Sequence, residues 1–513
     1  MKLQLCFRIL FPVFLLASAC SIKRLVVLKD DGKIEATFIQ INDVYEIAPL
    51  ANGTIGGMAR VGRLKKELKQ KNPNTYMVMS GDFVSPSVYN SLKFEGKAIR
   101  GRQMIEAMND AGVDLAVFGN HEFDIKESEL QDRINESEFK WVSSNTFHLN
   151  NNVVQPFEKL KGGAIEKFPE SYILSIKDAD GTTAKIGFIG LTLPFNKADY
   201  VHYTDPLSSA KKIYAQIKDS VDAVVAITHQ LMADDVKLAS EIPGLQIIMG
   251  GHEHDMRFQK VGNVYITKAH ANAKSAYVIN LAINKNTHQV RVNPVLKTLN
   301  STVPLDSSVN KIVNKWIAIA DDSFAAQGFD SKAVLLTKSD PLDGRETEIR
   351  TKSTNLTRLV TNSMLKAYPD ADASIFNSGS IRVDDILTAP VTQYDIIRTM
   401  PFGGGVHLIE MKGDLLQQTL DAGTKNKGIG GFLQYGNINL ESNTSWTVKG
   451  VKLNLQKVYK VVITDFLLSG KEANLDFLNE KNPGIMKIYP EENNPRNGKS
   501  DIRLLIIDYL KAK

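Results

Sequence analysis

Hydrophobic residues along the chain follow two alternating patterns. Continuous apolar runs, rich in β-branched residues, predict strands that are buried on both faces. Amphipathic spacing in residues 57–71 and 102–112 predicts helices between such strands. This alternation predicts an α/β core in which helices cover the sheets. The apolar runs end abruptly in Gly, Asn, Asp or His, and they are "TFIQIND", "YMVMSGD", "LAVFGNHEFD", "AVVAITH" and "LQIIMGGHEH".

The alternating pattern stops near residue 300, and this divides the chain into parts. Helical spacing in residues 306–327 predicts a connecting helix, and we assign residues 301–330 to this connection. A new helix is predicted at residues 354–368, and further strands follow it, so residues 331–513 form a second domain. A chain of 513 residues is too long for one compact core, which agrees with this division.

The first residues have the features of an export signal. Lys2 and Arg8 precede an apolar run at residues 9–17, which is too short to span a bilayer. We therefore expect residues 1–20 to be a signal peptide. No later apolar run is long enough for a transmembrane helix, so we expect membrane contact only at the N-terminus.

The end of this segment, "ASAC", fits two kinds of processing. Ala17 and Ala19 suit an ordinary signal peptidase, which would release a secreted or periplasmic protein. Cys20 suits lipoprotein processing, in which it becomes a lipidated first residue. We expect the lipoprotein type, because Cys6 and Cys20 are the only cysteines and both lie in this segment. The expected location is the bacterial periplasm or outer membrane surface.

Composition and charge exclude some classes of function. The formal net charge is only +5 over 513 residues, and no long run of Lys or Arg is present. Nucleic-acid binding therefore has no support from the composition. Hydrophobic residues make up 43% and charged residues 23% of the chain, which is the mixture of an ordinary globular protein.

Polar side chains gather at the ends of the predicted strands. A lone polar residue there is most often part of a turn, but five such ends argue for a shared site. Carboxylates and neutral imidazoles bind divalent metals, and two adjacent ions suit in-line displacement at phosphorus. "GGHEH" offers one histidine to each ion, and "SGD" offers a bridging carboxylate. The candidate residues are Asp43, Asp82, Asn120, His121, Asp124, His229, His252 and His254.

The order of these motifs resembles the calcineurin-type metallophosphoesterases. With the second domain, nearly the whole mature chain resembles the 5'-nucleotidase family. The resemblance implies an N-terminal metallophosphoesterase domain at residues 21–300, a β-sandwich flanked by helices. It also implies that residues 331–513 form a separate α+β domain that binds the substrate.

The resemblance also implies a role for each motif residue. Two divalent ions, such as Zn, Mn or Mg, would be held by Asp43 and His254 at the first site, by Asn120, His229 and His252 at the second, and by Asp82 between them. His121 would lie over the phosphoryl group, with Asp124 holding its other ring nitrogen. Water activated by the metals would be the nucleophile. Glu122 is interpreted as a structural residue.

Three segments of the second domain resemble family signatures: "NSGSIR", "MPFGGGVHLIEMKG" and "GGFLQYGNI". By position, Arg350, Asn377 and Arg382 would bind the phosphates or polar part of the substrate, because a guanidinium pairs bidentately with oxyanions. Phe402 would stack on a nucleobase. The alternatives are a core aromatic for Phe402 and a surface ion pair for Arg350.

The chain departs from the family pattern in three places. Tyr45 replaces a histidine that helps to hold the first metal. It could ligate a strongly acidic ion as a phenolate, but we expect a neutral phenol that does not coordinate. The aromatic, glycine-rich terminal loop is replaced by "SGKEANLDFL", in which Leu475 or Phe477 could substitute. A glutamate expected in residues 350–359 is also missing.

These features together predict a metal-dependent phosphoric monoester hydrolase that is exported and acts on nucleotides. The altered terminal loop leaves a sugar-phosphate or nucleotide-sugar hydrolase as the first alternative. A second alternative is a surface lipoprotein that keeps the fold for binding only. Retention of His121, Asp124 and six metal positions argues against that reading, because a binding protein does not need them.

Overall fold

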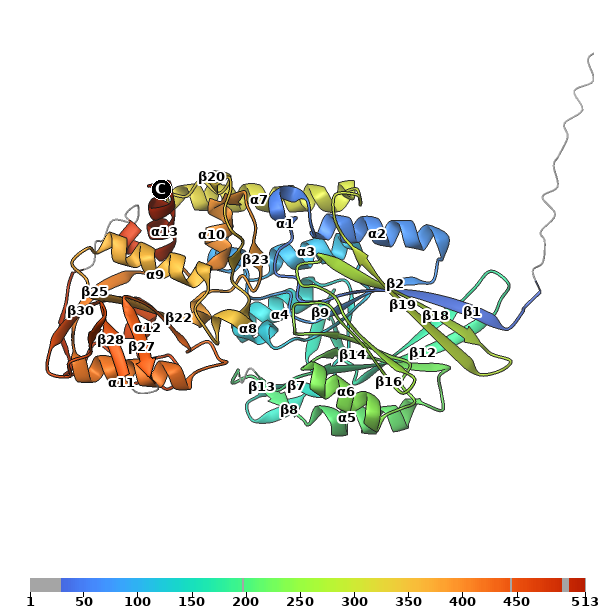
Figure 1. Cartoon of the computed structure of the whole chain (residues 1–513). Coiled ribbons are helices and arrows are strands. Elements are labelled where there is room, and N and C mark those ends of the chain that lie inside the picture. Colours follow the sequence, from blue (N-terminus) through green and yellow to red (C-terminus); the bar gives the residue numbers. More distant parts are fainter. Residues whose placement is uncertain (1–28, 196–197, 443–444, 491–497, 513) are drawn as a thin grey trace, which may run out of the picture.

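The computed structural model describes residues 29–195, 198–442, 445–490 and 498–512. The predicted signal peptide and its Cys20 lie outside these residues. Two six-stranded sheets form the N-terminal domain (Figure 1). The first contains, in spatial order, β19 (Gln289–Thr298), β18 (Ser275–Asn284), β1 (Lys33–Ile41), β2 (Thr75–Ser80), β5 (Leu115–Val117) and β6 (Lys140–Trp141). The second contains β11 (Ser171–Lys177), β12 (Thr183–Thr192), β14 (Ala223–His229), β15 (Ile247–Gly251), β17 (Val264–Lys268) and β16 (Arg257–Val261).

Four neighbouring strands in each sheet are parallel. They are β1, β2, β5 and β6 in the first sheet and β12, β14, β15 and β17 in the second, and the remaining strands pair antiparallel. Parallel strands end at the same sheet edge, so the residues that follow them meet there. This arrangement explains how five motifs that are far apart in the sequence form one site.

The continuous apolar runs are buried on both faces, as predicted. In β1, Phe38 faces the core between the sheets, where its ring lies 5.7 Å from that of Phe188. The next residue, Ile39, faces the opposite way, into the layer of helices. Helices α2 (Met58–Lys71), α3 (Arg102–Ala111) and α7 (Ser307–Ala326) cover that side, and α5 (Pro206–Ile217) and α6 (Met232–Glu241) cover the other (Figure 1).

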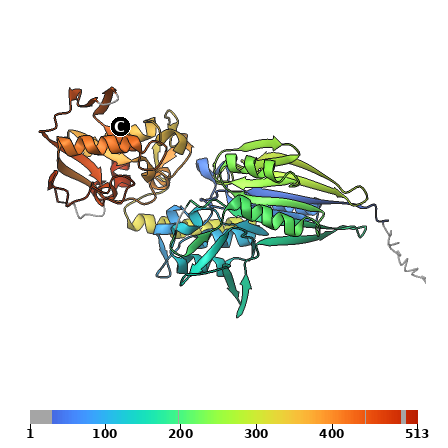
Figure 2. The same ribbon diagram turned by 90° about the horizontal axis from the view of Figure 1, so that it is seen from below.

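The C-terminal domain has one five-stranded sheet with helices on both faces. Its strands are, in spatial order, β26 (Leu433–Gly436), β22 (Ala373–Asn377), β30 (Val458–Thr464), β25 (Val406–Lys412) and β31 (Ile485–Ile488). Helices α9 (Asn355–Ala367) and α13 (Ile502–Lys511) pack on one face, and α11 (Gly413–Lys425) packs on the other. Figure 2 shows this domain as a body separate from the sandwich.

Shorter elements complete the molecule. The helices are α1 (Leu50–Gly53), α4 (Glu127–Glu136), α8 (Glu346–Ile349), α10 (Gln393–Thr399) and α12 (Asp465–Leu468). Small sheets pair β3 (Lys93–Phe94) with β4 (Lys97–Ala98), β9 (Glu158–Lys161) with β10 (Ala164–Lys167), β20 (Val334–Leu336) with β24 (Val391–Thr392), and β21 (Leu342–Asp343) with β23 (Ile386–Leu387). Two three-stranded sheets contain β13 (Val201–Tyr203), β7 (Thr146–Asn150) and β8 (Val153–Gln155), and β27 (Ile438–Ser442), β28 (Ser445–Val448) and β29 (Val451–Lys452).

The predicted connecting helix is α7, and it packs on the N-terminal domain. Trp316 of α7 is fully buried, and its indole N–H donates to Glu106 of α3 over 2.8 Å. The limits of the connection at residues 301 and 330 stay a prediction. Within the described part of the chain, no helix is both long enough and apolar enough to cross a membrane.

Candidate active site

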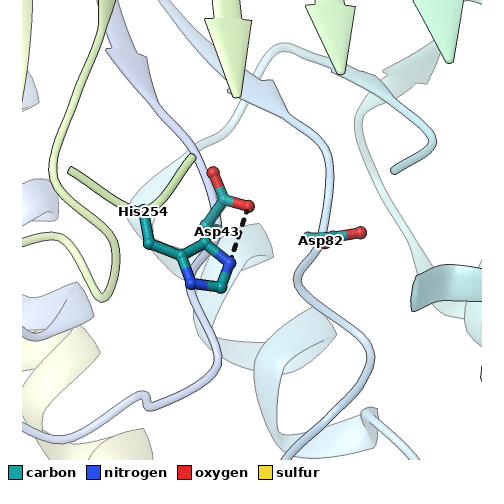
Figure 3. Close-up of side chains that lie close together, drawn as sticks. All are labelled: Asp43, Asp82 and His254. Atoms are coloured by element: carbon teal, nitrogen blue, oxygen red, sulfur yellow. Dashed lines mark ion pairs between the residues drawn. The ribbon is translucent and has the colours of Figure 1, made fainter. Parts of the chain in front are cut away.

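The predicted metal ligands lie together where the parallel strands end. Figure 3 shows Asp43 in the loop after β1, Asp82 after β2, and His254 after β15. One ligand atom from each of these residues lies within 4.8 Å of the others. The sheet edges therefore bring together side chains that the sequence separates by up to 211 positions, since residue 43 meets residue 254.

The backbone at these positions is strained. Asp43, Asp82, His252 and His254 have φ values of +53°, +56°, +93° and +54°, in the region that residues other than glycine rarely adopt. Hydrogen bonds hold two of these loops: the His252 N–H donates to Asp43 Oδ2 and the His121 N–H to Asp82 Oδ1, both over 2.9 Å. The loops thus aim their carboxylates inward at an energetic cost.

Glu122 fixes the loop that carries Asp82. Its buried carboxylate accepts backbone N–H groups from Asp82, Phe83, Val84 and Gly119 over distances between 2.5 and 3.0 Å. Gly119 must be glycine, because a Cβ atom there would lie 2.0 Å from Asp82 Oδ1. Burial, followed by Asp82, raises the pKa of Glu122 to about 7, although backbone N–H groups oppose this.

A buried lysine fixes the loop that carries the two histidines. Lys268 lies beneath this loop and pairs with Asp235 over 2.9 Å and with Glu253 over 2.5 Å. Glu253 separates His252 from His254 in the sequence, so this ion pair anchors the loop between them. No sequence motif marks Lys268. The only available signal in the sequence is its place directly after the short apolar run "VYIT".

Buried polar atoms lie at the predicted second metal position. His229 Nδ1 donates to the Ser80 carbonyl over 2.8 Å, so Nε2 is the nitrogen left to bind a metal, and it lies 3.1 Å from Asp82 Oδ2. Neither His229 Nε2 nor Asn120 Oδ1 has a hydrogen-bond partner among the described residues, and both atoms are buried. Buried nitrogen and oxygen atoms without a hydrogen-bond partner are suited to bind a divalent cation.

Charge around the two histidines agrees with this interpretation. Burial lowers the pKa of His229, but Asp82 and Asp43 outweigh it and raise the pKa to about 9, so without a metal this imidazole carries a proton that an ion would displace. Burial and then His229 lower the pKa of His252 to about 3, so its imidazole is neutral, as a ligand must be. Its ring centre lies 5.4 Å from that of His229. The residues therefore fit a pair of divalent ions.

His121 and Asp124 form the predicted pair. Nδ1 of His121 lies 2.7 Å from Asp124 Oδ2, and Nε2 lies 3.4 Å from the guanidinium of Arg382 in the C-terminal domain. Burial lowers the pKa of His121, but Asp82 and Asp124 outweigh this effect and raise it. The arrangement allows His121 to hold a proton beside an anion that Arg382 also contacts.

Tyr45 lies closer to the metal ligands than the sequence indicated. Its hydroxyl oxygen is 2.8 Å from His254 Nε2, 3.1 Å from Asp82 Oδ2 and 3.5 Å from Asp43 Oδ1. Burial, followed by Asp82 and Asp43, raises the pKa of this phenol well above its usual value. The group is therefore a neutral donor, as expected, but it lies among the ligand atoms of the first site.

The C-terminal domain supplies the predicted substrate residues. Phe402 is 70% exposed, so the alternative of a core aromatic is wrong. Arg350 pairs with Glu346 over 2.5 Å, and Arg382 lies 3.7 Å from the same carboxylate. The Arg350 side chain is only 22% exposed, so its ion pair is not an ordinary surface pair.

In the C-terminal domain, a polar contact lies in the segment where the family pattern has a second aromatic residue. Asn377 donates to Glu472 over 2.7 Å, in the segment that replaces the family's glycine-rich loop. Leu475 is fully buried in the domain core, and Phe477 packs against that core. Leu475 therefore cannot form an exposed wall opposite Phe402, which corrects that alternative, whereas the role of Phe477 stays a prediction.

Comparisons with known proteins agree with the geometry. The calcineurin-like phosphoesterase family matches residues 36–256, and the 5'-nucleotidase C-terminal domain matches residues 334–480. A 5'-nucleotidase from Bos taurus is 23% identical over 511 residues, covering 86% of this chain and 84% of that protein. A trifunctional nucleotide phosphoesterase from Bacillus subtilis is 25% identical over 492 residues, covering 86% of this chain and 32% of that protein.

Solved structures share the fold over nearly the whole chain. A 5'-nucleotidase precursor from Thermus thermophilus has a TM-score of 0.69 at 22% identity, covering 93% of this chain and 96% of that one. A sulfate thiohydrolase from Thermus thermophilus has a TM-score of 0.64 at 16% identity, covering 93% and 94%. The same fold therefore serves different hydrolytic reactions.

A strand-end cluster of candidate metal ligands and the matches to two domain families define a two-domain metallophosphoesterase, a class of phosphoric monoester hydrolases. Within that class, the chain belongs to the 5'-nucleotidase family. An enzyme of this class uses divalent metals, and Asp43, Asp82 and His254 form a candidate group for one of them. The alternative of a lipoprotein that only binds is therefore set aside.

Proposed function

We propose that this protein is an exported phosphohydrolase with two divalent metals that hydrolyses nucleotide phosphate esters. The observation that carries the proposal is the set of inward-facing acceptor atoms around Asp82, together with His121 beside them. Acceptors without donors are suited to cations, and a histidine held by a carboxylate is suited to proton transfer. Relatives named 5'-nucleotidase support the choice of nucleotide substrates.

The proposed metal ligands are those that the sequence predicted. Asp43 and His254 would hold the first ion, Asn120, His229 and His252 the second, and Asp82 both. The two ions would supply Lewis acidity and charge neutralisation for displacement at phosphorus.

The protein's own residues bind and orient the substrate. Arg382 and His121 together face the place where a phosphate oxygen would lie, since their nearest nitrogens are 3.4 Å apart. Asp124 keeps the Nδ1 proton of His121, so that Nε2 is the atom available for proton transfer. Arg350 and Asn377 would contact the polar part of the substrate, and Phe402 would stack on the base.

The C-terminal pocket leaves one alternative substrate class. Phe402 is exposed and Leu475 is buried, and Asn377 and Glu472 offer hydrogen-bonding groups. These features favour a hydroxyl-rich group, so a sugar phosphate or a nucleotide sugar is the second candidate. Residues 1–20 would direct export, with a lipid anchor at Cys20, and residues 21–300, 301–330 and 331–513 would be the catalytic domain, connection and substrate domain.

A single assay separates the candidates. Phosphate release should be measured with nucleoside mono-, di- and triphosphates, sugar phosphates, a nucleotide sugar and an aryl phosphate, each with added Mn, Mg, Zn or Ca. We expect activity that depends on added metal and is highest with nucleotides. A preference for sugar phosphates would replace the substrate class, and no release under any condition would contradict the proposal.

A further inference from the structure

His254 contacts both domains. Its Nε2 faces the carboxylate of Asp43 at 3.5 Å, on the side of the first metal site. Its Nδ1 bonds to Asp384, which lies in the C-terminal domain after the turn that contains Arg382. Both side chains are largely buried, with 16% and 17% of their surfaces exposed. A residue of the substrate domain therefore contacts a predicted metal ligand of the catalytic domain.

Asp384 is held firmly in place. It accepts the backbone N–H of Glu346 at the start of α8 over 2.6 Å. The next residue, Asp385, pairs with Lys274 of the catalytic domain over 2.7 Å. Tyr394 of α10 also donates to Glu46 across the same boundary. The loop around Asp384 is thus attached to both domains.

The bond to Asp384 decides which nitrogen of His254 faces the first metal site. An ionised carboxylate only accepts, so Nδ1 donates to it and Nε2 is the nitrogen that a metal would bind. His229 uses the same device for the second site, but its Nδ1 donates to the Ser80 carbonyl of its own domain. One ligand is therefore oriented from within the catalytic domain, and the other from outside it.

We propose that Asp384 is a positioning residue through which the C-terminal domain completes the first metal site. This inference rests on the proposed metal ligands. Carboxylates that orient a metal-binding histidine change metal affinity by about 10–100-fold, so contact between the domains and the first metal should stabilise each other. The second site should be independent of this contact, because Ser80 orients its histidine.

The test is metal affinity in the full-length protein. Mn²⁺ binding should be followed by calorimetry and electron paramagnetic resonance in Asp384→Asn and Asp384→Ala, with Asp385→Asn as the matched control. The control removes an ion pair at the same boundary without touching His254. We expect the first-site Kd to rise about 10–100-fold in Asp384→Ala and less in Asp384→Asn, which keeps an acceptor oxygen. The second-site Kd and both values in Asp385→Asn should be unchanged.

Unchanged affinity in both Asp384 variants, or an equal loss in Asp385→Asn, would overturn the inference. His254→Ala separates it from the proposed function. If His254→Ala still binds two ions as tightly as the wild type, the ligand assignment is wrong. If it loses one ion while the Asp384 variants keep both affinities, only the role of Asp384 is wrong.

A second measurement is independent of affinity. Amide hydrogen exchange in residues 382–386 should slow when Mn²⁺ is added to the wild type, because the metal strengthens the contact between the domains. The same addition should not slow exchange in Asp384→Ala. If Mn²⁺ does not slow exchange in these residues of the wild type, metal binding and the contact between the domains are not coupled.

Discussion

His121 is fixed from three sides, and this defines the chemistry available to it. Asp124 contacts its Nδ1, Asp82 accepts its backbone N–H, and Arg382 faces its Nε2. Both ring nitrogens of His121 face protein groups, so the ring is not positioned as a metal ligand. At the scale of single residues, the site therefore separates groups that would hold metal from groups that would move protons.

Replacement of His121 tests this separation. His121→Ala should lower kcat by about 10²–10⁴-fold, the usual contribution of a positioned acid–base group. Metal content, measured by elemental analysis, should remain the same as in the wild type. Loss of an ion in this variant would show that the ring is a ligand. Asp82→Asn is the comparison, because loss of the bridging carboxylate should weaken both sites.

Tyr45 is the second residue whose role can be isolated. The phenol is neutral and donates within the first site, so its hydrogen bonds to His254 and Asp82 must be given up when an ion binds there. Tyr45→Phe should therefore bind the first ion at least as tightly as the wild type, and Tyr45→His should bind it more tightly. Mn²⁺ titration measures both. A visible charge-transfer band that is lost in Tyr45→Phe would instead reveal an iron phenolate.

Among the helices and strands, the short 3-10 helix that starts at His121 contains several residues of the predicted site. It spans His121–Asp124 and contains both the proton-transfer pair and Glu122, whose carboxylate collects the N–H groups of the Asp82 loop. The strained φ of Asp82 persists because this neighbouring element holds it. The catalytic pair and a metal loop therefore form one structural unit.

This linkage predicts the effect of Glu122→Ala. The change leaves several buried N–H donors without an acceptor, at a cost of about 1–3 kcal/mol for each. The Tm should fall markedly, and the affinity for both metals should weaken because Asp82 is released. The control is Glu127→Ala, since that side chain is 54% exposed and pairs with His148. A Tm loss no larger than that of the control would contradict this role.

The regular elements could be predicted from sequence, whereas the contacts between them could not. Helices α2, α3, α7 and α9 begin and end within one residue of their predicted limits, because amphipathic spacing records a buried face. The motifs also identified residues that meet in space. Nothing local indicates that Asp384 meets His254, or that Glu46 meets Tyr394, because these pairs are separated by 130 and 348 positions. The positive φ values of Asp43, Asp82, His252 and His254 could not be predicted from the sequence either.

At the scale of the whole molecule, contacts across the boundary join the two domains. One of these contacts involves Glu46, a carboxyl group with a shifted pKa. Glu46 accepts a hydrogen bond from Tyr394 and is also near Tyr89, Arg398 and Asp395. Burial raises the pKa of Glu46 from 4.5 to about 7, against the effects of Tyr394 and Arg398. The folded protein thus holds this proton more tightly than the unfolded chain, so its stability should fall as pH rises from about 4.5 to 7.

Glu46→Gln isolates this dependence. The amide cannot ionise, so the variant should match the wild type near pH 4.5 and be more stable above pH 7, by up to about 3 kcal/mol for this shift. The measurement is Tm against pH for both proteins. A difference in Tm that does not grow as pH rises would show that Glu46 stays neutral or does not titrate alone.

Substrate choice also belongs to the whole molecule, because in the proposed function both domains would contact the substrate. Phe402→Ala should raise KM for nucleotides more than for sugar phosphates or an aryl phosphate, since stacking contributes about 1–3 kcal/mol per base. Steady-state kinetics on the three classes provide the comparison. An equal rise for all of them would favour the sugar-phosphate alternative.

The different supports of the two histidines have a consequence for assembly of the holoenzyme. His229 is oriented by its own domain, so the second site would be ready as soon as the sandwich has folded. His254 contacts Asp384, so the first site would be complete only after the C-terminal domain, which is synthesised later, has docked. Loading during refolding should therefore be ordered, and a half-loaded species should accumulate before the C-terminal domain docks. Native mass spectrometry of samples taken during refolding with Mn²⁺ should detect it as the dominant intermediate.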